Sequence, residues 1–232
     1  MPPMNEDTVR RRNLPHIDVD GKPYFITACL HGSIPAVGLS KIRRYREELA
    51  ARPVPSGKTE SQWKMTRQKL VFKMVDHLLD HESTVKHLSD DRLASVVQDS
   101  LLHFADERYH LFAFVVMPSH HHWLFLPIDE WADKQDSSIR TPRETISHSV
   151  QSFTGTQCNR ILGRQGKFWQ TETFDHFVRD EDEMFRIMNY IENNPVAAGL
   201  CKEPEQFRWS SARLRKELGI APGDPIPNPK VA

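Results

Sequence analysis

Apolar and polar positions along the chain follow two periods, one typical of strands and one typical of helices. The segment 22–30, KPYFITACL, is rich in β-branched and aromatic residues and is bounded by Gly and Pro, as expected of a strand. Two apolar runs, 109–117 and 120–128, are separated only by Pro-Ser and predict an antiparallel pair of central strands. A fourth strand is expected at 173–179, TFDHFVR.

Apolar residues three or four positions apart predict helices between these strands. They are expected at 41–50 after Ser40, near 67–80, near 91–105, from 142 to about 162, and at 181–194. Thr141 and Glu144 have the spacing of a capping box, and Asp180 with Glu183 three residues later marks the start of the last long helix. Pro195 is expected to end that helix, and a short helix is expected within 203–212.

The order of these elements predicts an α+β fold, a small ferredoxin-like antiparallel sheet covered by helices. With 232 residues and 38% apolar content, the chain is expected to form a single domain around one core. We expect a flexible basic arm at 1–13, the domain at 14–215 with a helical insertion near 51–105, and a tail at 216–232. The tail is so rich in Pro that it is not expected to join the core.

Composition narrows the choice of environment and partner. No apolar run approaches the length of a membrane span, and the three cysteines form no C-x-x-C pair, so a soluble cytoplasmic protein without a membrane partner is expected. The chain has 31 basic and 31 acidic residues, so net charge does not indicate nucleic-acid binding. Basic residues nevertheless gather in three places, each of which taken alone is also typical of a solvated face. These places are Arg10 to Arg12, the group Lys41, Arg43, Arg44 and Arg46, and the group Arg140, Arg143, Arg160, Arg164 and Lys167.

Three consecutive histidines open the second central strand. Because side chains alternate between the faces of a strand, His120 and His122 point to the same side and His121 to the other. Two imidazoles on one face can hold one metal ion with an amide or carboxylate as third ligand, which leaves room for phosphate oxygens. The spacing alone is equally compatible with ordinary hydrogen-bonded histidines.

Tyr190 and Asn194 are four residues apart on the last long helix and therefore share one face. Tyr190 lies at the edge of the apolar stripe, where it is either a packing residue or an inward-facing polar group. Phe168 and Trp169 lie next to basic residues, so they either stack on unpaired bases or close over the core.

Taken together, the motif MPSHHHWLF at 117–125 and the segment FWQTETFDHFVRDEDEMFRIMNYIENNPVAAGL at 168–200 resemble the single-tyrosine HUH transposases of bacteria. The best match is to the REP-associated tyrosine transposases. The segment LPHIDVDGKPYFITACLHGSIP at 14–35 belongs to the same resemblance, which covers most of the chain except 51–110 and the tail.

The resemblance implies an HUH endonuclease fold and a site in which His120 and His122 bind Mg²⁺ or Mn²⁺. Asn194 matches the position that supplies the third ligand, and Tyr190 matches the nucleophile. His121 departs from the bulky apolar residue usual in the middle of the motif. The implied reaction joins Tyr190 to a single-stranded DNA phosphate as a 5'-phosphotyrosine, releases a 3'-hydroxyl and allows strands to be rejoined without ATP.

The resemblance further implies DNA transposition on imperfect repeated palindromes folded into hairpins, by a monomer or a homodimer. We expect the DNA backbone to contact Arg143, Arg160, Arg164 and Lys167 and the arm Arg10, Arg11 and Arg12, and unpaired bases to contact Phe168 and Trp169. Two alternatives stay open. One is a non-catalytic nucleic-acid-binding module with the same sheet. The other is a zinc-dependent hydrolase, for which the sequence lacks an H-E-x-x-H helix and a third clustered His or Cys.

Overall fold

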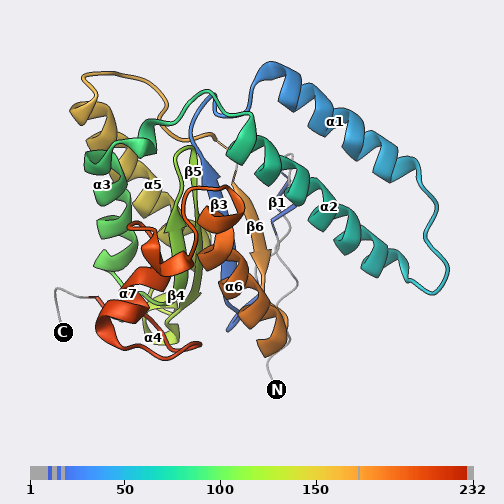
Figure 1. The fold of residues 1–232 in the computed structure, drawn as a ribbon. Helices are drawn as coiled ribbons and strands as arrows, with labels where there is room; N and C mark the ends of the chain where they lie inside the picture. The colour runs from blue at the N-terminus through green and yellow to red at the C-terminus, as the bar shows by residue number, and fades with distance from the viewer. Residues whose placement is uncertain (1–9, 12–14, 17–18, 172, 229–232) are drawn as a thin grey trace.

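An antiparallel sheet of four strands lies at the centre of the structure (Figure 1). The computed structural model describes residues 10–11, 15–16, 19–171 and 173–228. Along the sheet the strands follow the order β4-β5-β3-β6. Their bounds are Tyr24–Cys29 for β3, Tyr109–Val116 for β4, His120–Pro127 for β5 and Phe174–Phe177 for β6. A separate two-stranded pair, β1 (Arg10–Arg11) and β2 (Pro15–His16), precedes the sheet.

The connections between the strands define the topology. The chain leaves β3, passes through helices and returns as β4, while β5 lies between these two strands and pairs with both. A helix then leads to β6, which pairs with the other edge of β3. All neighbouring strands in this sheet are antiparallel, so the order is that of a ferredoxin-like fold, as predicted.

Seven α-helices are present in the described part of the chain, together with two short 3₁₀ helices. Their bounds are Ala36–Ala51 for α1, Glu60–His81 for α2, Asp91–His103 for α3, Asp129–Ala132 for α4, Pro142–Ile161 for α5, Glu181–Ala197 for α6 and Ser211–Leu218 for α7, with η1 at His87–Ser89 and η2 at Pro204–Gln206. The predicted capping box of α5 is present, with Thr141 and Glu144 each bonded to the other's backbone amide. Asp180 caps α6 as predicted. None of the helices in these ranges combines the length and apolar character needed to cross a bilayer.

Helix ends differ from the sequence prediction at three places. α1 begins at Ala36 rather than after Ser40, and α2 begins at Glu60, well before 67, because Thr59 and Gln62 form a second capping box. Pro195 does not end α6, which continues to Ala197. A proline in the last turn removes only one helical hydrogen bond, and the helix ends where Gly199 adopts a left-handed φ of 72°.

Helices cover both faces of the sheet. α3 and α5 pack on one face against alternate residues of the strands, including Ile26 and Trp123. α6 and part of α2 cover the opposite face, where Phe25 and Leu124 point. Figure 1 shows α1 and α2 as a long helical pair extending from the side of the sheet that carries β6. The two helices share a core of their own that includes Leu49, Trp63 and Val75.

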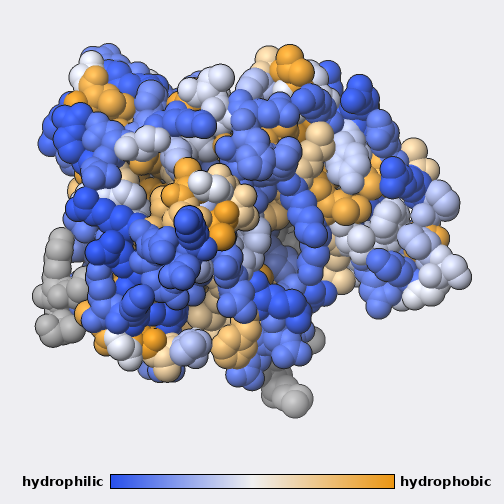
Figure 2. Space-filling model, viewed as in Figure 1, coloured by the Kyte–Doolittle hydropathy of each residue, from blue (hydrophilic) through white to orange (hydrophobic). Residues whose placement is uncertain are grey.

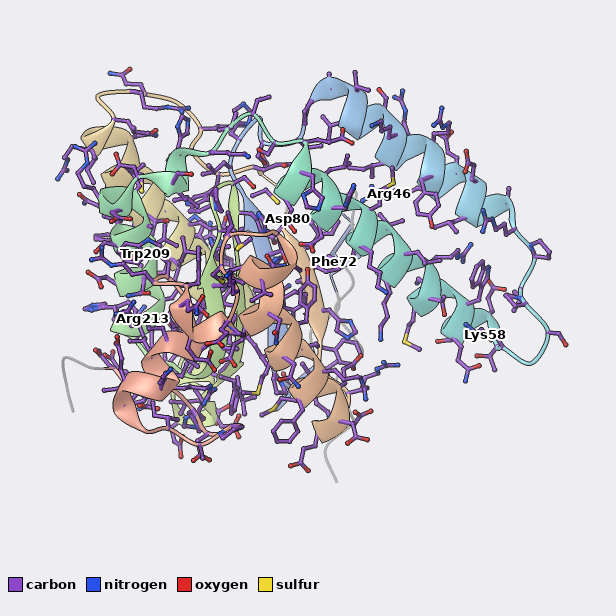
Figure 3. The ribbon with its side chains drawn as sticks, viewed as in Figure 1. Arg46, Lys58, Phe72, Asp80, Trp209 and Arg213 are labelled. Carbon is purple, nitrogen blue, oxygen red and sulfur yellow. The ribbon has the colours of Figure 1, made fainter. Side chains whose placement is uncertain are left out.

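The surface is mainly hydrophilic on the face drawn in Figure 2, with small hydrophobic patches between the polar residues. Figure 3 gives the same view with side chains. There Lys58 marks the loop that joins α1 to α2, while Arg46 extends from α1 and Phe72 from α2.

The C-terminal tail is not separate from the core, contrary to the prediction. Ile226 is fully buried, and its backbone amide donates to the carbonyl of Leu111 in β4 over 2.6 Å. Arg215 of α7 donates to the backbone carbonyls of Ala221 and Asp224, both at 2.9 Å, and so ties the tail down. Prolines make the tail irregular, but they do not prevent a single apolar side chain within it from being buried.

Candidate active site

His120 and His122 lie on the face of β5 that α2 and α6 cover, and both are fully buried. Their Nε2 atoms are 3.1 Å apart, so the two imidazoles are directed at the same point. His122 pairs across the sheet with Thr27 of β3, whose Oγ1 lies 2.7 Å from its Nδ1. The strand alternation predicted from the sequence therefore places the two rings together, as expected.

The hydrogen bonds of Ser119 determine which nitrogen of His120 carries a proton. The single hydroxyl proton of Ser119 is donated to the carbonyl of Leu79, 3.0 Å away. The contact of 3.0 Å between Ser119 Oγ and His120 Nδ1 must then be a bond donated by Nδ1. Burial, reinforced by the neighbouring His122, also lowers the pKa of His120 well below its usual value. A neutral ring with its proton on Nδ1 leaves the lone pair on Nε2, the form required of a metal ligand.

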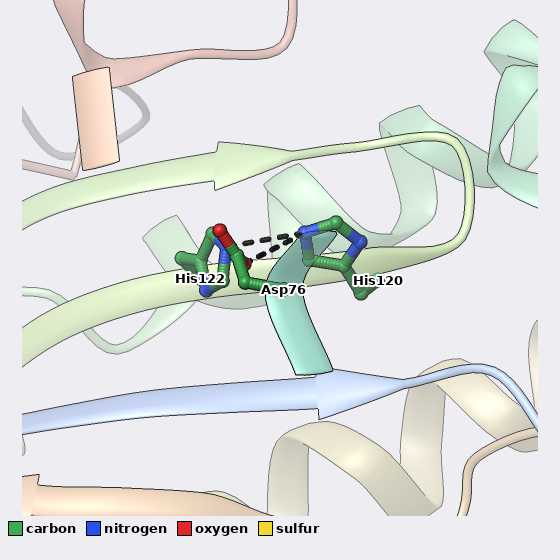
Figure 4. Close-up of side chains that lie close together, drawn as sticks. All are labelled: Asp76, His120 and His122. Carbon is green, nitrogen blue, oxygen red and sulfur yellow. Dashed lines mark hydrogen bonds and ion pairs between the residues drawn. The ribbon is translucent and has the colours of Figure 1, made fainter. Parts of the chain in front are cut away.

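A third side chain, Asp76 of α2, reaches the same point (Figure 4). Its Oδ1 lies 3.1 Å from Nε2 of His122 and 3.9 Å from Nε2 of His120. Asp76 is 9% exposed. Burial by itself would raise its pKa, but the two histidines and Tyr190 outweigh burial and hold the pKa at about 2. The carboxylate is therefore ionised beside the two imidazoles.

This group has the composition of a divalent metal site. The ligand atoms of Asp76, His120 and His122 all lie within 4.8 Å of one another. Oδ1 of Asp76 is buried, yet it makes no hydrogen bond of proper geometry within the described chain, as is expected of an atom that serves a cation. Two imidazoles and a carboxylate suit Mn²⁺, Mg²⁺ or Zn²⁺, so the residues present fit the ion that the resemblance implies.

Asp80, one helical turn after Asp76, is a second acid near this group (Figure 3). Its Oδ1 lies 3.9 Å from Nε2 of His120 and is likewise buried without a hydrogen bond in the described residues. Burial, together with the negative charge of Asp76, raises the pKa of Asp80 to about 7. The site thus holds one carboxylate that is ionised and one that titrates near neutrality. Neither acid is among the site residues predicted from the sequence, although two acids spaced i, i+4 within an apolar helix stripe are an available signal.

Tyr190 lies beside the histidines, on α6. The centroid of its ring is 5.5 Å from that of His122, and it meets Phe25 and Phe72 edge to face at 5.9 Å each. Burial, followed by the negative charge of Asp76, raises the pKa of Tyr190 far above its usual range. The phenol is therefore held neutral in this environment.

Asn194 is buried on the same face of α6, and its amide nitrogen lies 3.4 Å from the hydroxyl of Tyr190. Its Oδ1 makes no hydrogen bond within the described residues. A buried amide oxygen without a partner is compatible with the predicted role of third ligand, but the position closest to the two imidazoles is occupied by Asp76. Asn194 thus remains a predicted ligand, and Asp76 is an additional candidate.

His121 points to the opposite face of the sheet, as the sequence predicts. Its ring lies 4.9 Å from that of Trp169, and the residue is 1% exposed. Burial lowers its pKa to about 3, so this histidine is a neutral core residue. The departure from a bulky apolar residue is therefore accommodated by aromatic packing.

Three of the predicted DNA contacts are buried instead. Arg143 forms an ion pair of 2.8 Å with Asp175, and the side chains are only 3% and 4% exposed. Phe168 and Trp169 belong to the core on the α3 and α5 side of the sheet, and Trp169 donates to Thr154 over 2.8 Å. The structure does not favour DNA contact by these three residues, which stays a prediction, because their polar groups and ring faces are already engaged inside the protein.

The other predicted DNA contacts lie at the end of α5 and in the loop after it. Arg160 and Lys167 are exposed. Arg164 is half-buried and contacts His87 at 2.8 Å. For Arg10 and Arg11 only the backbone of β1 is described, and Arg12 lies outside the described residues.

Comparisons with known proteins give limited similarity. No protein-family model matches the chain. An uncharacterized protein of Haemophilus influenzae (strain ATCC 51907 / DSM 11121 / KW20 / Rd) is 30% identical over 94 residues, which cover 36% of this chain and 52% of that protein. The chain thus matches about half the length of this relative. Among solved structures, a REP-associated tyrosine transposase bound to a REP hairpin is similar over 95% of this chain and 90% of its own, with 17% identity and a TM-score of 0.49. A likeness of this degree assigns no activity by itself.

Proposed function

We propose that the chain is a DNA-cleaving transposase of the single-tyrosine type, which cuts single-stranded or hairpin DNA through a covalent link to Tyr190. One observation carries this proposal: the ring of Tyr190 lies 5.5 Å from that of His122, within a site where Asp76 and two imidazoles converge. A tyrosine nucleophile and a metal-ligand group in one site are the two requirements of this chemistry.

The proposed step can be written with its atoms balanced. The hydroxyl oxygen of Tyr190 attacks a DNA phosphorus, the bond from phosphorus to the 3' oxygen breaks, and the phenolic proton ends on the released 3'-hydroxyl. The product is a 5'-phosphotyrosine, which a later 3'-hydroxyl can attack in the reverse sense. A divalent cation held by Asp76, His120 and His122 would offset the carboxylate charge and stabilise the charge that develops on the phosphate.

The surroundings of Tyr190 support a role in positioning as well as in packing. Phe25 and Phe72 hold its ring from two sides. Two residues further along α6, Glu192 accepts hydrogen bonds from Ser211 at 2.7 Å and from Arg215 at 3.0 Å. These bonds fix the rotation of α6 about its axis, so the phenol is kept on the side of the histidines.

Hydrolysis by a bound zinc ion is the second candidate, and one observation favours it. The sequence lacks an H-E-x-x-H helix, but Asp76 supplies a third ligand from a distant helix, and two histidines with a carboxylate occur in zinc hydrolases. The transposase proposal accounts in addition for Tyr190 at the same site. The two candidates differ in one observable, the covalent protein–DNA product.

The deciding experiment traps that product. Hairpin oligonucleotides copied from repeats flanking the gene are incubated with Mg²⁺ or Mn²⁺, labelled at either end, and separated on a denaturing gel. We expect a 3' label to stay with the protein and a 5' label to be released on a shorter strand. Tyr190→Phe should abolish the covalent band, whereas the matched control Tyr45→Phe, on α1 outside the site, should keep it.

The other outcomes contradict the proposal. Cleavage without a covalent band indicates a hydrolase, and a shifted native complex without cleavage indicates a binding module. His122→Ala and chelation of the metal should each remove the band while leaving the protein folded.

A further inference from the structure

A cleft of about 560 Å³ lies beside the candidate active site, between α1, α2, α6 and the edge strand β6. Tyr190 forms part of its wall, so the cleft and the site are continuous. Much of the wall comes from the helical pair α1 and α2, which lies between β3 and β4 in the chain. Apart from the two carboxylates of α2, this pair has no role in the sequence motifs or in the proposed reaction.

The rim of the cleft is rich in positive charge. Six basic side chains line it: Arg46, Lys64, Arg67, Lys69, Lys73 and Arg186. Two acidic residues line it as well, and both form ion pairs: Asp175 with Arg143 at 2.8 Å, and Glu183 with Arg179 at 2.7 Å and with Lys69 at 3.0 Å. Of the other lining cations, Arg67 pairs with Glu60 at 3.5 Å. The lining therefore carries an excess of positive charge, which is complementary to a polyanion.

The inside of the cleft is aromatic. Phe72 stands between Phe174, at a ring distance of 6.0 Å, and Tyr190, at 5.9 Å, and Phe25 lies 5.5 Å from Phe72. Phe72 and Phe174 are half-buried, so each presents part of its ring to the cleft. Figure 3 shows that Arg46 and Phe72 come from the neighbouring helices α1 and α2. α2 supplies cations to the cleft as well as the ring of Phe72.

This combination identifies the chemical class of the ligand. Cations along a groove bind phosphates, and aromatic rings within it stack on bases, which is the arrangement of proteins that bind single-stranded nucleic acid. In a duplex the faces of the bases are covered by their neighbours and cannot reach rings recessed below a rim. The occupant is therefore an unpaired strand.

We propose, on the basis of the function proposed above, that this cleft binds the single-stranded DNA segment that leads to the phosphate cut by Tyr190. The cations of α1 and α2 hold its backbone, and Phe72 and Phe174 stack on its bases. The helical pair thus serves as a clamp for the strand.

Binding without cleavage tests this proposal. Fluorescence anisotropy with labelled oligo(dT) is measured in EDTA, so that no metal-dependent reaction takes place. We expect the double variant Lys64→Glu with Lys73→Glu to bind at least about tenfold more weakly. If two phosphate contacts are lost, the slope of log affinity against log salt should become shallower by about 1.4. The matched control reverses Lys134 and Lys202, which are exposed and outside the cleft, and should bind as the wild type does.

A second variant separates stacking from charge. Phe174→Leu keeps an apolar side chain but removes the ring, so it should weaken binding while leaving the salt slope unchanged. If charge reversal impairs folding, judged by thermal unfolding, Lys64→Gln with Lys73→Gln replaces it, with the same expected change in salt slope.

The cleft proposal fails if the charge-reversed protein binds oligo(dT) as tightly as the wild type. It also fails if the charge reversal weakens the binding of a blunt duplex as much as it weakens the binding of oligo(dT). Its failure is distinguishable from that of the proposed function. If the wild type forms no covalent band but binds single strands in EDTA, the transposase proposal is refuted and the cleft proposal is not. If the wild type forms a normal band but the cleft variants bind oligo(dT) as tightly as the wild type, only the cleft proposal is refuted.

Discussion

The ring of Tyr190 lies 5.5 Å, centroid to centroid, from the imidazole of His122, although the two residues are 68 positions apart in the chain and come from different elements. α6 packs across the face of the sheet that carries His122, and this packing brings a phenol next to a buried pair of imidazoles. The proposed chemistry depends on this contact together with the carboxylate of Asp76.

The third metal ligand can be determined by substitution. Asp76→Asn should lower the affinity for Mn²⁺ by at least about tenfold, because among the described residues it replaces the one carboxylate within 4 Å of both imidazoles, whereas Asp80 reaches His120 alone. Asn194→Ala should have a smaller effect. Isothermal titration with Mn²⁺ compares the two, with the exposed Asp182→Asn as control. A larger loss of Mn²⁺ affinity in Asn194→Ala than in Asp76→Asn would show that Asn194, and not Asp76, is the more important third ligand.

The buried ion pair of Arg143 and Asp175 is expected to stabilise the fold and not to bind DNA. Arg143→Met should reduce the free energy of unfolding by about 3–5 kcal/mol, because it leaves a buried carboxylate without its charged partner. Arg160→Met, at an exposed position on the same helix, should change it by no more than about 0.5 kcal/mol. Urea unfolding measures both values. An Arg143→Met protein that is as stable as the wild type but binds DNA more weakly would instead support the predicted contact of Arg143 with the DNA backbone.

The tail is expected to contribute to the core chiefly through Ile226, its fully buried apolar side chain. Ile226→Ala should lower the free energy of unfolding by about 2–5 kcal/mol, since the side chain is fully buried. Ile139→Ala, at a position that is 67% exposed, provides the matched control and should be nearly neutral. Equal stability of the two variants in urea would mean that the tail is not held on the sheet in solution.

Acid should destabilise the protein through Glu183. Burial alone would raise the pKa of Glu183, but Arg179, Lys69 and His176 outweigh it and hold that pKa well below its usual range. A lowered folded pKa means that the stabilisation is complete above the ordinary value of 4.5 and is lost as the pH falls below it. Burial also lowers the pKa of His176 from 6.5, so its protonation opposes folding in the same direction.

Urea unfolding between pH 7 and pH 3.5 tests this dependence. The wild type should lose stability steadily on acidification, and Glu183→Gln should start less stable at pH 7 and lose less. Parallel curves for the two proteins would show that Glu183 does not titrate with folding.

The features that the sequence predicts correctly depend mainly on interactions between residues close together in the chain. The alternation of side chains along a strand is a property of the backbone, so it placed His120 and His122 on one face and His121 on the other without knowledge of any neighbour. The capping box at Thr141 and the cap at Asp180 likewise depend on residues within one turn. The ferredoxin-like order followed because few topologies are open to this succession of strands and helices.

Only the tertiary structure decided which residues join the histidines and which predicted DNA contacts are buried. Asp76 meets His122 because α2 crosses the sheet more than forty residues away along the chain, and local periodicity contains no record of such a contact. Arg143, Phe168 and Ile226 are buried for the same reason, since each is covered by a segment distant in sequence. Local backbone geometry fixes the direction of a side chain relative to its own element, whereas long-range packing fixes what that side chain meets.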